Sequence, residues 1–122
     1  MKQVAILLIC ISILGCKNSD SNSSKKEEYS LIYIDDGAIQ CEFSGKPPEE
    51  TAQVLIDNGI DVIESSCGYI KGLEVSAQCG LGDTNINIHT IPIQNTQDAL
   101  DHGYSEVSEL NDGYQDICNE NA

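Results

Sequence analysis

The chain has 122 residues and a formal net charge of −14, from 20 acidic residues against six lysines and no arginine. From Tyr29 onward the only lysines are Lys46 and Lys71. Because phosphate contacts need clustered Lys and Arg, this composition excludes nucleic acid as a partner, and it excludes anionic lipid as an electrostatic partner of the domain. The 94 residues of 29–122 suffice for one small domain.

Residues 1–15 have the pattern of a signal peptide. Lys2 precedes an apolar run, Val4 to Gly15, whose 12 residues are fewer than the roughly 20 of a membrane helix. The run ends in Ile13-Leu14-Gly15-Cys16, which resembles the lipobox of bacterial lipoproteins. This resemblance implies cleavage before Cys16, acylation of Cys16 with palmitate-type chains, and anchoring in the lipid bilayer of the bacterial cell envelope.

Residues 16–28 are predicted to be a lipidated, flexible tether. The 12 positions from Lys17 to Glu28 contain no apolar side chain, so they cannot contribute to a core. In Gram-negative lipoproteins an aspartate after the anchoring cysteine retains the protein in the inner membrane. Lys17 at this position therefore favours the outer membrane, with the domain facing the periplasm or the cell surface.

An even number of cysteines in a small exported domain predicts a disulfide framework. Three pairings are open, and we favour Cys67–Cys79, which would close a glycine-rich excursion, together with Cys41–Cys118. The chain has no C-x-x-C pair, which disfavours a zinc or redox role. The expected disulfide cysteines are Cys41, Cys67, Cys79 and Cys118.

The first half of the domain predicts two strands and a helix. Tyr29–Ile34 is apolar and β-prone, and Ala38–Phe43 alternates apolar with polar residues, as a half-buried strand does. A helix is expected to begin near Pro48 and to end at Asn58-Gly59, with Ile60 folding back on Leu55.

The second half predicts three more strands and a short helix. Within the strand starting at Asn85, alternation places Ile86 and Ile88 on the buried face and His89 on the polar face, so we expect a surface histidine. The expected elements are strand Ile60–Cys67, strand Asn85–Ile93, helix Thr96–His102 capped by Asn95, strand Ser105–Leu110 and a polar tail Asn111–Ala122.

These elements predict a small α+β domain stapled by disulfides. From Ala38 to Leu110 they follow the order β-α-β-β-α-β of ferredoxin-like topology. The run from Gly37 to Gly68 is similar to short exported bacterial proteins, a resemblance that implies no activity.

Two carboxylate pairs are the most conspicuous polar features, Asp35-Asp36 and Glu49-Glu50. Adjacent acids in a turn and at a helix start serve turn chemistry and the helix dipole more often than catalysis. Asp83 opens a calcium-loop-like run that lacks the required glycine and glutamate. The sequence therefore predicts no catalytic residue, no metal ligand and no cofactor.

The function predicted from these features is a non-catalytic envelope lipoprotein whose domain binds another macromolecule. Acidity favours a basic protein as partner, as for an inhibitor or an immunity-type protein. The expected contact residues are Asp35, Asp36, Glu49 and Glu50. A structural envelope component, a weak divalent-cation binder and a small enzyme remain open as alternatives.

Overall fold

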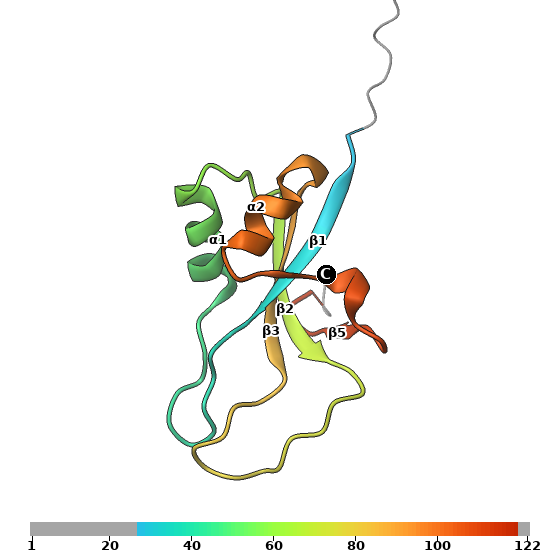
Figure 1. Ribbon diagram of the computed structural model, residues 1–122. Coiled ribbons are helices and arrows are strands. Elements are labelled where there is room, and N and C mark those ends of the chain that lie inside the picture. The colour runs from blue at the N-terminus through green and yellow to red at the C-terminus, as the bar shows by residue number, and fades with distance from the viewer. Residues whose placement is uncertain (1–26, 120–122) are drawn as a thin grey trace, which may run out of the picture.

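The computed structural model describes residues 27–119, so the predicted signal peptide, Cys16 and most of the tether lie outside the described residues. The described chain is an α+β domain in which two helices cover one face of a five-stranded antiparallel sheet (Figure 1). The strand order is β4-β1-β3-β2-β5. The elements are β1 Tyr29–Asp35, α1 Pro48–Asp57, β2 Glu64–Ile70, β3 Asn85–Pro92, the 3₁₀ turn η1 Ile93–Asn95, α2 Thr96–Asp101, β4 Ser105–Glu106, the 3₁₀ turn η2 Val107–Glu109 and β5 Tyr114–Asp116.

Helix α1 begins and ends where the sequence predicts. Pro48 stands in its first turn, where a missing N–H costs nothing. At its end Gly59 adopts a left-handed φ of +81°. The Gly59 N–H donates to Ile56 O and the Ile60 N–H to Leu55 O, each at 3.0 Å, which is the Schellman pattern. Ile60 and Leu55 are both buried as a result.

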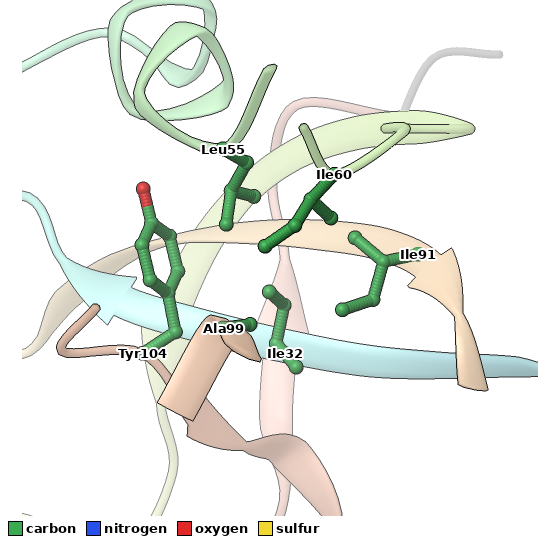
Figure 2. Close-up of a cluster of buried hydrophobic side chains, with 6 residues drawn as sticks. All are labelled: Ile32, Leu55, Ile60, Ile91, Ala99 and Tyr104. Carbon is green, nitrogen blue, oxygen red and sulfur yellow. The ribbon is translucent and has the colours of Figure 1, made fainter. Parts of the chain in front are cut away.

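The main core lies between the helices and the sheet. Figure 2 shows aliphatic side chains of β1, β3 and α1 converging on Ala99 of α2 and on the ring of Tyr104. Burial of such side chains contributes roughly 1.5–3 kcal/mol each. The cluster consists of Ile32, Leu55, Ile60, Ile91, Ala99 and Tyr104, with Ile34 and Val62 packed against it.

The C-terminal segment covers the opposite face of the sheet. Strand β4 pairs with β1 and β5 pairs with β2, so the chain crosses from one edge of the sheet to the other between Glu106 and Tyr114 (Figure 1). Both faces of the central strand β3 are therefore buried. His89, which we expected on the surface, is fully buried on the helix side, and that expectation is wrong.

Other expectations need correction as well. Residues 38–43 do not form a strand: Ile39 and Phe43 bond to each other through backbone N–H and C=O groups, and Cys41 takes a φ of +73°, so the segment is a tight turn. The first strand of the sheet is β1 instead. Strand β2 starts at Glu64 rather than at Ile60. The strand expected over Ser105–Leu110 is only the two-residue β4, Ser105–Glu106. The side chain of Asn95 does not cap α2. The expected polar tail contains β5.

Two disulfides staple the domain, as predicted, but their pairing differs from the favoured one. The bonds are Cys41–Cys79 and Cys67–Cys118. Cys67 lies in β2 next to the end of β5, where the N–H groups of Ile117 and Cys118 both donate to Cys67 O. The addition of β5 to the sheet therefore gives Cys67 a different partner from the loop cysteine Cys79.

Candidate functional site

Two loops project beyond the sheet at the end opposite the start of β1 (Figure 1). We call residues 36–47 and 71–84 together the distal loops. They connect β1 to α1 and β2 to β3, respectively. The Cys41–Cys79 disulfide joins them at a Cα–Cα distance of 5.1 Å. The loops are therefore one covalently linked structural unit rather than two independent connections.

Gln40 reinforces this link with both ends of its side-chain amide. Its Nε2 donates to Ser76 O at 2.9 Å and to Gly82 O at 3.0 Å, and its Oε1 accepts from the Gln78 N–H at 3.0 Å. Its backbone N–H donates to Leu81 O, and its backbone O accepts from the Gly80 N–H. The first loop is thereby fixed in register against the second.

The distal loops carry apolar side chains that the fold does not bury. Ala38 is their only hydrophobic residue in the core. The remaining large apolar side chains are 37–57 % exposed. These are Ile39, Phe43, Leu73, Val75 and Leu81.

Two open hollows lie in the distal loops. One, of about 450 Å³, is lined by residues 38–44 with Asp83 and Asn85. The other, of about 600 Å³, is lined by Gln40, Asp83 and Thr84 together with Leu73, Glu74, Val75 and Ala77. Their charged lining residues are Glu42, Glu74 and Asp83, and neither lysine of the domain lines either hollow.

The four expected contact residues lie around the junction of β1, the first distal loop and α1. Asp35 accepts the Gly37 N–H at 2.6 Å and stays exposed, as do Glu49 and Glu50 in the first turn of α1. The Lys46 N–H donates to Asp36 O at 2.8 Å, which brings the start of α1 back to the end of β1. Three of the four acids are therefore available to a partner.

Asp36 has a different environment, since it is only 9 % exposed. Its Oδ1 accepts the Ala38 N–H at 2.8 Å, which organises the turn into the first loop. Burial raises the pKa of Asp36 despite that hydrogen bond, and the nearby Asp83 and Asp35 raise it further. Asp36 therefore stabilises the turn into the first distal loop and is not exposed for contact with a partner.

A buried polar network crosses from β2 through β3 to α1. Thr51 Oγ1 donates to Pro48 O at 3.2 Å, so its oxygen is left to accept from His89 Nε2 at 2.8 Å. His89 Nδ1 then accepts the hydroxyl proton of Ser65 at 2.7 Å. The hydroxyl of Tyr104 donates to Thr51 O at 2.5 Å. Burial lowers the pKa of His89 from 6.5 to about 4, so the ring is neutral at pH 7.

The sequence did not predict this network. In the structure its hydrogen bonds satisfy polar groups inside the core. A serine bonded to a histidine is a nucleophile–base arrangement in hydrolases. Here, however, both ring nitrogens are bonded inside the domain and the ring has no solvent exposure. Ser65 itself is partly exposed and lines a hollow of about 190 Å³ together with Glu64 and Thr90. The network fixes α1 to the sheet.

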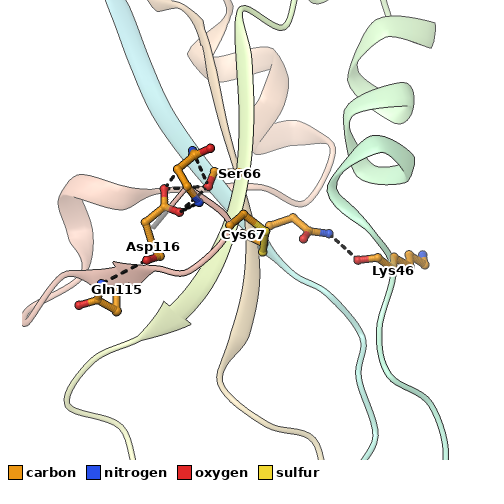
Figure 3. Close-up of a disulfide and its surroundings, with 8 residues drawn as sticks. Lys46, Ser66, Cys67, Gln115 and Asp116 are labelled. Carbon is orange, nitrogen blue, oxygen red and sulfur yellow. Dashed lines mark hydrogen bonds between the residues drawn. A yellow bond between two sulfur atoms is a disulfide. The ribbon is translucent and has the colours of Figure 1, made fainter. Parts of the chain in front are cut away.

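A second polar cluster fastens the C-terminal segment to β2. Figure 3 shows Ser66 beside Asp116, whose two carboxylate oxygens accept from the Ser66 hydroxyl at 2.7 Å. Burial raises the pKa of Asp116, but hydrogen bonds from Ser66, Asn119 and the Cys118 N–H outweigh burial and lower it overall. A separate hydrogen bond ties β3 to the first distal loop: the side-chain amide of Asn87 donates to Lys46 O at 2.9 Å.

The remaining candidate positions are less informative. His102 is exposed and bonds through Nδ1 to Asp98 O at 2.8 Å, at the end of α2. Within residues 27–119, no three or more His, Cys, Asp or Glu side chains are grouped so as to hold a metal ion. Over the same part of the chain, every helix is too short or too polar to cross a membrane.

In comparisons with known proteins, no family model, no curated protein and no solved structure matches the chain. Another acidic hollow, of about 210 Å³, is lined by Glu27, Glu28 and Asp61 with Tyr29 and Ile63. The distal loops differ from it in being joined by a disulfide and by the hydrogen bonds of Gln40.

Proposed function

We propose that the protein is a lipid-anchored binding domain of the bacterial cell envelope, non-catalytic, whose partner is a basic protein. An inhibitor or immunity-type protein acting on a basic toxin or hydrolase is the narrower form of this proposal. The observation that carries it is the charge distribution. Of the acidic residues in the described chain, all but Asp36 escape burial, and only Lys46 and Lys71 oppose them.

Such a surface suits electrostatic recognition. Acidic side chains of one sign, spread over a small domain, attract a cationic protein over several ångströms and accelerate encounter. The same charge repels other acidic envelope components, which narrows the choice of partner.

The anchor is supported by the order of signal core, lipobox and polar tether. Two or three acyl chains on Cys16, at roughly 0.8 kcal/mol for each buried methylene, give durable membrane attachment. For Cys16→Ala we expect a soluble or unprocessed protein on detergent phase partition. Cys16→Ala protein of mature size in the detergent phase, as for the wild type, would remove the anchor from the proposal.

Partner binding is tested by affinity capture from the cell envelope. The immobilised domain, beginning at Glu27, is loaded at low salt and eluted with rising salt, and bound proteins are identified by mass spectrometry. We expect a basic protein that elutes with salt. Exclusively acidic proteins, or proteins that only denaturant removes, would contradict the proposal.

We further propose that the fold has ferredoxin-like topology with a fifth strand added at one edge. The element order β1-α1-β2-β3-α2-β4 and the neighbours β4-β1-β3-β2 support this assignment. In this arrangement the two β-α-β units are interleaved. The β1–α1 and β2–β3 connections then lie at the same end of the sheet, where they form the distal loops.

A further inference from the structure

We infer that the distal loops are the docking surface for the basic partner, and that the partner segment they bind combines a cationic side chain with apolar neighbours. This inference rests on the proposed function and names its site.

The first support is apolar surface that folding does not explain. Phe43 and Leu73 are 48 % and 57 % exposed, and Ile39, Val75 and Leu81 lie in the same two loops. Single exposed apolar residues need no explanation, but several in one projecting unit mark an interaction site. Aromatic and aliphatic side chains of this kind are the usual anchors of a protein interface.

The second support is rigidity. A disulfide and the five hydrogen bonds of Gln40 hold loops that contribute a single alanine to the core. Stabilising an exposed loop in one conformation reduces the entropy lost on binding. The disulfide also stabilises the domain, and together with the hydrogen bonds of Gln40 it holds the exposed loops in one conformation, as preorganisation for binding requires.

The third support is charge, which selects the partner. Both hollows contain Asp83, whose two oxygens accept from Asn85 at 2.9 Å, and the exposed carboxylates beside it are Glu42 in one hollow and Glu74 in the other. These carboxylates lie beside apolar groups, with Ile39 and Phe43 in the first hollow and Leu73 and Val75 in the second. A lysine or arginine side chain matches this lining, since its apolar stem packs on such groups while its charge meets the carboxylates.

The direction of the loops agrees with an anchored protein. The chain enters the domain at the start of β1, and the distal loops project from the other end (Figure 1). The distal loops are therefore at the end of the domain that the predicted tether does not join, where the tether does not cover them.

The test uses the full-length protein in the bacterium that encodes it, with a photo-crosslinking amino acid in place of Phe43 or Leu73. Matched controls carry it in place of Val54 or Ile56 on α1, which are 44 % and 50 % exposed. We expect positions 43 and 73 to crosslink to the same basic protein, with at least tenfold less of that adduct at positions 54 and 56.

Binding of the identified partner to the full chain then separates the roles. We expect Phe43→Ser with Leu73→Ser to weaken affinity at least about tenfold, mainly through faster dissociation, at unchanged melting temperature. Ile56→Ser should change affinity less than about twofold.

Each other outcome overturns the inference in its own way. Equal adducts of a basic protein at all four positions would keep the proposed function but reject the distal loops as its site. Adducts between two copies of the chain would make the loops a self-association surface. An acidic partner at positions 43 and 73, or no adduct there, would reject both the site and the charge argument.

Discussion

At the residue scale, the buried histidine shows how polar groups are accommodated in a small core. Burial holds His89 neutral because a charged ring in that position would be poorly solvated, and Thr51 and Ser65 satisfy the two nitrogens of the neutral ring. The network therefore stabilises the fold only while His89 stays unprotonated.

We expect acid to destabilise the domain through His89. The folded pKa of about 4 lies below the ordinary 6.5, so the unfolded chain binds more protons between these values. The associated stability is fully present above about pH 6.5 and is lost as pH falls towards 4, by about 3 kcal/mol. Urea unfolding at pH 7, 5.5 and 4.5 measures this loss.

His89→Gln is the control, because glutamine keeps a donor and an acceptor but does not titrate in this range. We expect it to be less stable at pH 7 and to lose less stability on acidification than the wild type. If the unfolding free energies of the wild type and His89→Gln fell equally between pH 7 and pH 4.5, the assigned role of His89 would be contradicted.

The position of His89 could not be predicted from local sequence. Alternation in β3 separates Ile86 and Ile88 from Asn87 and His89 correctly, but it does not say which face is covered. The helices cover the polar-looking face and the C-terminal segment covers the other. Hydrogen bonds to Thr51, Ser65 and Lys46 O then make the polar side chains acceptable.

At the element scale, the pairing of β5 with β2 includes a close backbone approach at Gly68. Gly68 in β2 packs directly against the backbone of Gln115 and Asp116, where an added Cβ would overlap with the carbonyl oxygen of Gln115. The Cys67–Cys118 bond and the Ser66–Asp116 hydrogen bonds lie beside it. The fifth strand depends on a glycine at this position.

We expect Gly68→Ala to displace β5 and to cost about 1–3 kcal/mol of unfolding free energy, typical of overpacking. Amide exchange of Ile117 and Cys118 should accelerate. Gly82→Ala is the matched control, since its Cβ would meet only Ala38 O, at 3.8 Å. Equal stability of the two variants would contradict the close approach.

We also expect non-reducing peptide mapping to recover the pairs Cys41–Cys79 and Cys67–Cys118. Removal of either bond with two serines should cost about 2–4 kcal/mol. The variant without Cys41–Cys79 should bind the partner more weakly than the variant without Cys67–Cys118, because only the former loosens the distal loops. A Cys67–Cys79 peptide would contradict the structure.

Helix α1 could be predicted because its signals are local: prolines and acids at its start, and Asn58-Gly59 at its end. The disulfide pairing and β5 could not, because they depend on which strand the tail meets. Residues 38–43 show the same limit, since six alternating residues suit a tight turn as well as a strand.

At the scale of the whole molecule, anchor, acidic surface and distal loops are three separable parts of one proposal. The anchor sets location, the surface charge sets the rate of encounter, and the loops set the lifetime of the complex. Charge reversal and loop substitution should therefore change different rate constants.

The most direct measurement of the central claim is the association rate constant with the captured partner at different salt concentrations. Between about 0.01 and 0.15 M salt the Debye length shortens from about 30 to about 8 Å. We expect the wild-type rate to fall at least several-fold. Glu49→Lys with Glu50→Lys should slow low-salt association further, at a stability cost of roughly 0.3–1 kcal/mol each. A rate indifferent to salt and to this reversal would contradict electrostatic recognition of a basic partner.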